Sequence, residues 1–383
     1  MSSGTKSGCG EPILLVSESY HSADMYYASG FLAPDRFVYL CQDDKKYLFV
    51  SQMEFERAKK EAKVKNVHSM EEYDYMGRLR ALRDPELALV DTLAAIFASL
   101  KIKKARVPVD FPLLTADLLR AKSIEVIPAP RLFDEARSVK APDEIEKIKK
   151  AQAVNEMAME HAISIIEASK PVNGVLHYEG KPLTSEFLQS EVDLVFVRNG
   201  YDTTDSIVAA GPGSADPHFS GAGPIKENEP IVIDIYPYGK KGRYWADMTR
   251  TVVKGRPSPE VQKMYDAVLG AQNVALNAIK AGVTGKQVHD MVCDYFEKLG
   301  YGTTRTGAAE GFIHSTGHGV GINIHEYPSI GDAGLEPLKP GQVVTVEPGL
   351  YIKGIGGVRI EDMVVVTDKG NINLTKAPKK LVV

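Results

Sequence analysis

Short apolar runs alternate with helical patterns over the first third of the chain. Residues 13–16 predict a buried strand, and residues 37–40 and 47–50 flank a polar turn, which predicts a hairpin. Helical patterns lie near 52–61, 85–100 and 113–121, with strands near 105–109 and 124–127. This alternation indicates a small α/β domain that ends near Arg137.

The longest helical pattern covers residues 142–169. Pro142 stands where helices often begin, and Asp143 and Glu144 would lie in the first turn, where negative charge is favourable. We therefore expect an N-terminal domain of residues 12–137 and a second domain of residues 138–383 that begins with this helix. A further helical pattern follows at 184–197.

From Ser206 onward, extended segments dominate and helices are grouped apart from them. Extended segments are predicted at 207–210, 231–236, 244–253, 342–346 and 363–367, and helices at 258–281 and 285–299. Such grouping is typical of an α+β arrangement and not of a parallel doubly wound sheet. The predicted fold class is therefore α+β, with a smaller α/β domain at the N-terminus.

Composition supports two domains and excludes several classes of partner. A chain of 383 residues is longer than one hydrophobic core usually covers. The net charge of -4 and the pI near 6.2 do not provide the basic surface that nucleic acids require, so no nucleic-acid partner is expected. No apolar run approaches the length of about 18 residues that a membrane-spanning helix needs, so no membrane partner is expected either.

The three cysteines, Cys9, Cys41 and Cys293, are scattered along the chain. Their spacing predicts neither a disulfide framework nor a zinc finger. The N-terminus also lacks the apolar core of a signal peptide. A reducing, cytoplasmic location is the simplest expectation from this pattern.

Two aspartates interrupt strand-like sequence in the second domain. Asp234 ends the apolar run Ile231-Val232-Ile233, and Asp247 follows thirteen positions later in Trp245-Ala246-Asp247-Met248-Thr249-Arg250-Thr251. Burying an unpaired carboxylate is costly, so each needs a partner or a metal unless it faces water. If the turn at residues 239–242 joins adjacent strands, both carboxylates can point at one place.

Three of the nine histidines fall within twelve residues, at His314, His318 and His325. Glycines surround them in His314-Ser315-Thr316-Gly317-His318-Gly319-Val320-Gly321 and let the backbone approach a ligand closely. The spacing alone does not say which histidine binds a metal, and any one of them could instead have a structural role.

Two glutamates complete the pattern. Glu347 follows the run Val343-Val344-Thr345-Val346, and Glu361 lies in Gly357-Val358-Arg359-Ile360-Glu361. Arg359 would share a face with Glu361 on an extended chain, so the alternative interpretation of this pair is an ordinary structural salt bridge. Taken together, four carboxylates and a histidine in one domain predict a site for two divalent ions, which is a design for hydrolysis.

This series of motifs resembles the pita-bread metallopeptidases, a family that includes methionine aminopeptidase, Xaa-Pro aminopeptidase and prolidase, with creatinase as a metal-free relative. The matching motifs span residues 218 to 361. The N-terminal domain is similar in size and α/β texture to the creatinase-type domain, which methionine aminopeptidases lack. The resemblance therefore implies a pita-bread catalytic domain of the Xaa-Pro branch.

The resemblance also implies a role for each residue. Metal ligands would be Asp234, Asp247, His318, Glu347 and Glu361, with Asp247 and Glu361 bridging two Mn, Co or Zn ions. Glu347 would take a proton from a bridging water, and His325 would stabilise the tetrahedral intermediate. His218 would bind substrate, His314 would lie near the substrate pocket, and Arg359 would orient Glu361.

Two departures from the family pattern bear on these roles. The family's two aspartates are commonly eleven positions apart, and Tyr236 occupies that position here. A hairpin two residues longer keeps Asp234 in register, because an even insertion preserves strand facing. Dedicated prolidases often carry an arginine between the ligand histidine and the first glutamate, whereas this chain has only Lys339 between His318 and Glu347.

The predicted activity is hydrolysis of the bond between an N-terminal residue and proline, on a peptide substrate with proline at its second position. A strict Xaa-Pro dipeptidase remains an alternative, although the missing arginine favours longer peptides. A creatinase-like hydrolase without metal and a non-catalytic binding module are further alternatives, and both usually lose ligands that this chain retains. The family is often dimeric, so a homodimer is expected.

Overall fold

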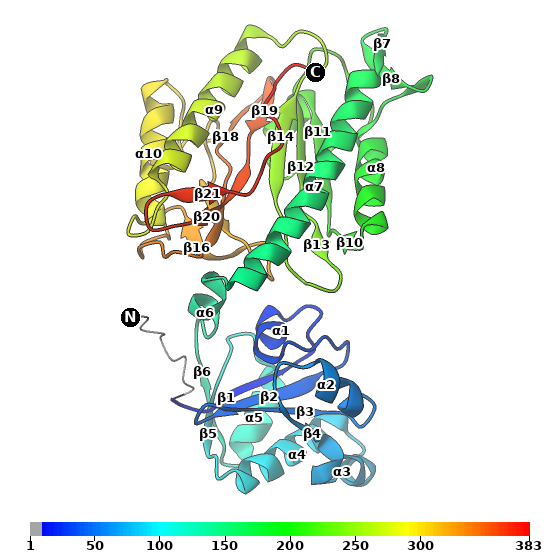
Figure 1. Ribbon diagram of the computed structural model, residues 1–383, viewed down its shortest axis with the longest axis vertical. Coiled ribbons are helices and arrows are strands. Elements are labelled where there is room, and N and C mark those ends of the chain that lie inside the picture. The colour runs from blue at the N-terminus through cyan, green and yellow to red at the C-terminus, as the bar shows by residue number, and fades with distance from the viewer. Residues whose placement is uncertain (1–9) are drawn as a thin grey trace. The chain divides into compact units, whose positions relative to one another are not determined.

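The computed structural model describes residues 10–383, so Cys9 lies outside the described residues. The chain divides into two compact units, one up to Ala136 and one from Arg137 to Val383 (Figure 1). Each unit has its own apolar cores. None of the described helices is both long enough and apolar enough to cross a membrane.

The N-terminal unit is built on one mixed six-stranded sheet in the order β4-β3-β2-β1-β5-β6. The strands are β1 (Ile13–Ser17), β2 (Phe37–Gln42), β3 (Lys45–Val50), β4 (Asn66–Ser69), β5 (Lys104–Val107) and β6 (Glu125–Pro128). The helices are α1 (Ala23–Ser29), α2 (Phe55–Glu61), α3 (Tyr75–Leu82), α4 (Pro85–Ser99), α5 (Leu113–Ala121) and α6 (Asp134–Ser138). Alternate residues of the sheet face two separate apolar clusters, which confirms the predicted small α/β fold.

Some elements of this unit differ from the prediction. Helix α2 begins at Phe55, because residues 52–54 form a turn. The parallel edge strand β4 and helix α3 were not predicted, since β4 is short and mostly polar and α3 is short with no buried residue. Of the other two cysteines, Cys41 lies buried on β2 and Cys293 is a buried free thiol.

The second unit consists of two similar halves, each with a pair of helices packed on a sheet. In the first half α7 (Pro142–Ala168) and α8 (Ser185–Arg198) cover the sheet of β11 (Ser206–Ala210), β12 (Ile231–Ile235) and β14 (Met248–Val252). In the second half α9 (Pro259–Ala278) and α10 (Gly285–Lys298) cover the sheet β16-β15-β17-β20-β21. The strands of that sheet are β15 (Gly317–Gly319), β16 (Glu326–Ile330), β17 (Val343–Val346), β20 (Asp362–Val366) and β21 (Asn371–Asn373).

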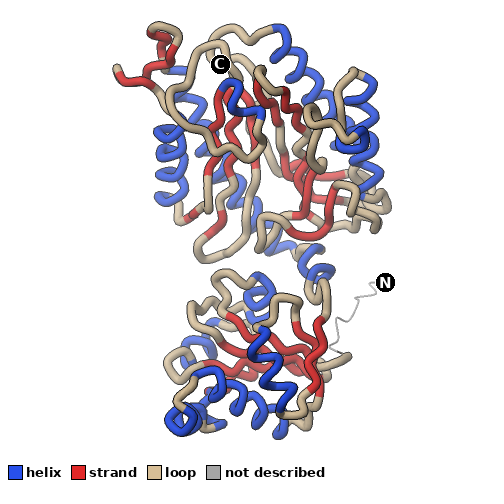
Figure 2. The backbone as a smooth tube through the Cα atoms, turned by 180° about the vertical axis from the view of Figure 1, so that it is seen from behind, coloured by secondary structure: helices blue, strands red, loops and turns tan. Residues whose placement is uncertain are grey.

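All four helices of this unit lie on the same side of its sheets. They stand in front of the strands in Figure 1, and the strands stand in front of them in Figure 2, which shows the opposite side. None of these four long helices therefore covers the open face of the curved sheets, as in a pita-bread fold. The predicted α+β class of the second domain is confirmed.

The extended segment predicted at residues 244–253 is only partly a strand. Strand β14 begins at Met248, and residues 236–247 form an irregular hairpin that contains the short strand β13 (Tyr238–Gly239). Asp247 therefore lies one residue before the strand and not within it. The hairpins β7–β9 (residues 170–182) and β18 (Gly349–Ile352) with β19 (Gly356–Arg359) were also not predicted, because glycines and short lengths hide their alternation.

A buried arginine ties the first sheet to the second and to the C-terminal segment. Arg250 on β14 is 2% exposed, and its Nη2 lies 2.9 Å from Oδ1 of Asp362 on β20. The same guanidinium donates to the carbonyl oxygens of Glu361, Ala377 and Pro378 at 2.6–3.1 Å. Because all five N–H groups of arginine are donors, one side chain can satisfy this set of buried acceptors.

Replacing Arg250 by methionine is expected to lower the free energy of unfolding by about 3 kcal/mol, because Oδ1 of Asp362 and several buried carbonyl groups lose their donor, although Lys379 and Asn373 still contact Oδ2 of Asp362. Chemical denaturation followed by circular dichroism would measure the change. The matched control is Lys149→Met, since its pair with Glu146 is exposed and should contribute less than about 1 kcal/mol. Equal effects of the two substitutions would contradict this role for Arg250.

Candidate metal centre

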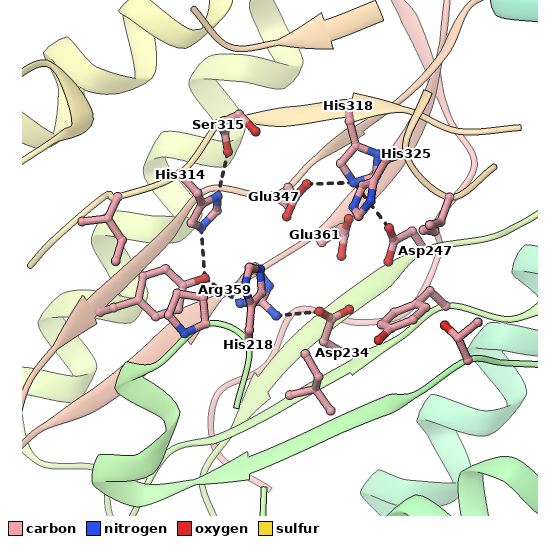
Figure 3. A pocket seen from close by; sticks show the side chains of 17 residues that line it. His218, Asp234, Asp247, His314, Ser315, His318, His325, Glu347, Arg359 and Glu361 are labelled. Atoms are coloured by element: carbon pink, nitrogen blue, oxygen red, sulfur yellow. Dashed lines mark hydrogen bonds and ion pairs between the residues drawn. The ribbon is translucent and has the colours of Figure 1, made fainter. Parts of the chain in front are cut away.

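The open face of the second unit contains a cavity of about 640 Å³. Every side chain predicted for the site lines this cavity (Figure 3): His218, Asp234, Asp247, His314, His318, His325, Glu347, Arg359 and Glu361. These residues are spread over more than 140 positions of sequence, from His218 to Glu361, and the fold brings them together.

Strand alternation explains why the carboxylates of the first half face the cavity. Ile231, Ile233 and Ile235 of β12 pack against α7 and α8, so Asp234 points to the opposite face. Strand β14 pairs with β12 in a register that places Asp234 opposite Thr249, two residues after Asp247. The two-residue longer hairpin thus lies in the loop, and Asp234 and Asp247 line the same cavity.

The same alternation operates in the second half. Val344 and Val346 of β17 lie in the apolar core under α9, which directs Glu347 to the other face. Ile360 also lies in that core, and Glu361 follows it between β19 and β20. Glu347 and Glu361 therefore each follow a buried aliphatic residue that faces the apolar core, while the acidic side chain itself faces the cavity.

Three side chains lie close enough to share one ion. One ligand atom from each of Asp247, His318 and Glu361 lies within 4.8 Å of the others. Nδ1 of His318 is 3.1 Å from the carbonyl oxygen of Gly319, so Nε2 is directed at the carboxylates, 3.6 Å from Oδ2 of Asp247. A backbone hydrogen bond of this kind usually fixes the ring of a metal-binding histidine.

The other two predicted ligands flank this group. Oε1 of Glu347 is 3.2 Å from Nε2 of His318, and Oδ2 of Asp234 is 2.6 Å from Nη2 of Arg359. His318 thus contacts Glu347, and Arg359 forms an ion pair with Asp234, at the edge of the cluster. Tyr236, the residue at the family's usual aspartate position, also lines the cavity.

The cluster concentrates negative charge in a buried place. Burial, followed by the charge of Asp234, raises the pKa of Asp247 well above its usual value, and burial followed by the charge of Asp247 does the same for Glu361. Burial opposes ionisation of His318, but its hydrogen bond to Glu347 and the nearby carboxylates raise its pKa to about 9. Burial opposes the charge of Glu347 as well, yet His318 lowers its pKa to about 2.

Two buried oxygen atoms of the cluster have no hydrogen-bond partner. They are Oδ1 of Asp234 and Oε1 of Glu361. An unpaired buried acceptor is costly, and a cation would satisfy both atoms while it offsets the excess negative charge. Carboxylate oxygens with one imidazole suit divalent ions such as Mn, Co or Zn, so the residues present fit the ions that the resemblance implies.

Arg359 has a different partner from the one expected. It forms no ion pair with Glu361, although both side chains are described; its Nη2 pairs with Asp234 and its Nη1 donates to the Tyr351 hydroxyl at 2.5 Å. Its Nε donates to Oγ1 of Thr249, which in turn donates to Oε2 of Glu361 at 2.8 Å. Arg359 therefore orients Asp234 directly and reaches Glu361 only through Thr249.

Three hydroxyl groups support the site and were not predicted. Besides Thr249, Oγ1 of Thr345 lies 3.1 Å from Oε1 of Glu347 and accepts the backbone N–H of His318. The Tyr351 hydroxyl lies 3.0 Å from Nε2 of His314. A sequence signal existed for the two threonines, since each lies two residues from a carboxylate on the same face of a strand.

The remaining histidines form the rest of the wall. His325 packs edge-on against His318, with ring centroids 4.3 Å apart, and burial lowers its pKa. Burial lowers the pKa of His314 to about 4. Both rings are therefore neutral at pH 7, and each can donate one hydrogen bond. His218 is exposed and follows the turn η2 (Gly211–Ala215).

Comparison with protein families assigns both parts of the chain. Residues 146–368 match the model of metallopeptidase family M24, and residues 13–139 match that of the creatinase/prolidase N-terminal domain. The Xaa-Pro dipeptidase of Pyrococcus furiosus is 31% identical over 362 residues, which cover 94% of this chain and 92% of that protein.

Solved structures agree with the sequence comparison. The Xaa-Pro dipeptidase from Bacillus anthracis superposes with a TM-score of 0.81 at 30% identity and covers 97% of this chain and 95% of that one. The X-Pro aminopeptidase from Thermotoga maritima superposes with a TM-score of 0.80 at 29% identity, with 97% of each chain covered.

Replacing Glu361 by glutamine is expected to stabilise the protein after dialysis against a chelator and to destabilise it with Mn²⁺ present. The raised pKa of Glu361 means that its charge costs stability above that pKa, a cost that glutamine removes and a cation offsets. Thermal unfolding at pH 7.5 should show shifts of opposite sign and a few degrees, since about 1 kcal/mol corresponds to about 2–4 °C at this size. Glu160→Gln, an exposed position on α7, is the control. Shifts of the same sign in both conditions would rule out a cation at Glu361.

Proposed function

The chain belongs to metallopeptidase family M24, and on that premise we propose that it hydrolyses the bond between an N-terminal residue and proline. Its similar proteins include an Xaa-Pro dipeptidase and an X-Pro aminopeptidase, and they match along both units of the chain. The observation that carries the proposal is the buried carboxylate and histidine cluster with two unpartnered oxygens, set in a cavity on the open face of the sheets.

Five side chains would hold two divalent ions, Mn, Co or Zn: Asp234, Asp247, His318, Glu347 and Glu361. Asp247 and Glu361 lie centrally in the cluster and would serve both ions, while Asp234 and the pair His318 and Glu347 would each serve one. When bound, such ions lower the pKa of a water molecule and polarise the scissile carbonyl group.

Glu347 is suited to move the proton. Its carboxylate lines the cavity beside Nε2 of His318, at 3.2 Å, and as a positioned carboxylate it can accept a proton from the attacking water. The nitrogen of proline needs that proton to leave as an amine, because without it the cleaved bond would expel a strongly basic nitrogen anion. Thr345 fixes Oε1 of Glu347, so the other oxygen is free to carry the proton.

The neutral histidines would bind and orient the substrate. His325, held against His318, can donate an N–H to the oxygen of the scissile carbonyl as negative charge develops there. His218 is exposed at the mouth of the cavity and would contact the peptide. His314 is hydrogen-bonded to Tyr351 and would shape the pocket for the residue after the cleaved bond.

Two alternatives predict no hydrolysis of peptides by a metal-loaded protein. Neither a metal-free hydrolase of the creatinase type nor a non-catalytic binding module requires metal ligands. The five carboxylate and histidine residues in this cavity therefore argue against both alternatives. Metal analysis after loading with Mn²⁺ or Co²⁺ separates them from the proposed peptidase, because neither would retain a divalent ion.

Two further parts of the proposal concern the whole protein. A homodimer is proposed from the family resemblance, and light scattering would test it. A cytoplasmic location is proposed from the few, scattered cysteines.

Mn²⁺-loaded protein is expected to release alanine from Ala-Pro or Ala-Pro-Ala but not from Ala-Ala-Ala. Glu347→Ala and Asp247→Ala should each abolish turnover and lower metal occupancy, since both remove a ligand and Glu347 also removes the proton carrier. Chromatography of the released amino acid and elemental analysis provide the two measurements. Absence of release from every proline peptide with Mn, Co and Zn in turn would refute the proposed activity.

His325→Ala is expected to lower kcat by about 10²–10³, the usual effect of losing one donor to a developing oxyanion. Metal occupancy should stay at the level of the unmodified protein, because His325 is not proposed as a ligand. Steady-state kinetics and elemental analysis on the same sample would check both points. Full activity in this variant would show that the assigned role is wrong.

A further inference from the structure

A second cavity, of about 670 Å³, lies beside the metal centre. It is lined by Pro212, Asp216, Phe219, Glu310, Tyr351 and Lys353, among others. None of these residues except Tyr351 lines the first cavity, so the proposed chemistry does not use them.

The two cavities meet at Tyr351 and at the loop that follows η2. Tyr351 lines both of them, and in the sequence Asp216-Pro217-His218-Phe219 the central two residues line the first cavity and the outer two line the second. In Figure 3 His314 and Arg359, the hydrogen-bond partners of Tyr351, lie on the side of the first cavity away from Asp247. The second cavity therefore continues the cleft on the side remote from the three-ligand cluster.

Backbone contacts hold the walls of this second cavity in place. Gly311 and Tyr351 exchange two backbone hydrogen bonds of 2.9 and 3.1 Å, which fix the loop that carries Glu310 against β18. On the opposite wall the N–H of Gly357 donates to Oγ of Ser214 at 2.8 Å, and a Cβ at Gly357 would meet the carbonyl oxygen of Ser214 at 2.1 Å. This close approach, which only glycine permits, packs the β18–β19 hairpin onto η2.

The cavity offers one apolar surface and one positive charge. Phe219 is 38% exposed, unusually open for a phenylalanine, and Pro212 lies on the same wall. Lys353 stands at the turn between β18 and β19, is exposed, and forms no ion pair with any described side chain. Among the residues that line this cavity it is the only cation, while Asp216 and Glu310 are acidic, so Lys353 is the side chain that can pair with a carboxylate there.

The distances suit one additional residue of a bound peptide. Tyr351 lies on β18 and Lys353 is the first residue of the turn that follows, two positions later, so the backbone between them spans at most about 7 Å. One residue of an extended peptide spans about 3.3–3.6 Å, so a chain that passes Tyr351 brings its next residue and its terminal carboxylate to the lysine. An aminopeptidase needs such a continuation, because all but one residue of its substrate lies beyond the cleaved bond.

We propose that this second cavity binds the residue after proline, with its side chain against Phe219 and its α-carboxylate at Lys353. The inference rests on the proposed function and makes it more specific: the substrates are Xaa-Pro-Yaa tripeptides with a free carboxylate, in preference to Xaa-Pro dipeptides. It also explains how a chain without the prolidase-type arginine between His318 and Glu347 can still bind a peptide terminus.

The test compares kcat/KM of the Mn²⁺-loaded enzyme on Ala-Pro, Ala-Pro-Ala and Ala-Pro-Ala-amide. The unmodified enzyme should prefer the tripeptide to the dipeptide, and should prefer the free tripeptide to its amide by roughly threefold to fivefold, the value of an exposed ion pair. Lys353→Met should bring the ratio of free to amidated tripeptide close to one, and Lys353→Glu should invert it. The matched control is Lys369→Met, because Lys369 is also an exposed lysine at a hairpin turn but lines neither cavity.

The outcomes distinguish the two proposals. No cleavage of any of the three peptides would refute the proposed function itself. Cleavage with a faster rate on Ala-Pro than on Ala-Pro-Ala would overturn the preference for tripeptides. An unchanged ratio of free to amidated tripeptide in both Lys353 variants, or the same loss in Lys369→Met, would overturn the assignment of the carboxylate to Lys353.

Discussion

The confinement of several carboxylates in one buried cavity is the constraint on which the rest of the second unit depends. Burial raises the pKa of both Asp247 and Glu361, and the neighbouring charges of Asp234 on Asp247 and of Asp247 on Glu361 raise the two pKa values further, so the cluster resists ionisation until positive charge is supplied. Arg359 and His318 supply part of this positive charge, and the hydroxyl groups of Thr249 and Thr345 donate hydrogen bonds to Glu361 and Glu347. Two oxygens still lack a partner, which is why the cavity is suited to cations and not merely to water.

The arrangement that maintains this confinement is apolar. Each acidic side chain lies within a strand or directly next to one, and aliphatic residues of these strands pack under a pair of helices, so the same packing that stabilises the unit also directs charge to the open face. Arg250 joins the two sheets at the point where Glu361 enters, and its hydrogen bond to the Glu361 carbonyl fixes the backbone there. Stability and site geometry are therefore coupled through the same few strands.

Around this common centre, one hairpin contributes residues to both cavities. The hairpin of β18 and β19 carries Arg359 toward the metal centre on one strand and Lys353 toward the neighbouring cavity at its turn. A single rigid element thus links the reacting centre to the surface that would bind the end of the peptide. Relatives with the names dipeptidase and aminopeptidase share the fold at similar identity, so the overall fold does not distinguish the two specificities.

The sequence by itself determined the two-domain α+β class, because hydrophobic periodicity and grouping are local properties of the chain. It also determined which residues line the cavity, since Asp247, His318, Glu347 and Glu361 stand in short motifs that interrupt apolar strands. Only the tertiary structure decided which side chains form hydrogen bonds and ion pairs with one another. Arg359 forms an ion pair with Asp234 and not with its near neighbour Glu361. Tyr351 lines both cavities, and Lys353 and Phe219 line the second one together. Such pairings depend on strand register and on close glycine contacts between segments more than a hundred residues apart, and nothing in the local sequence encodes them.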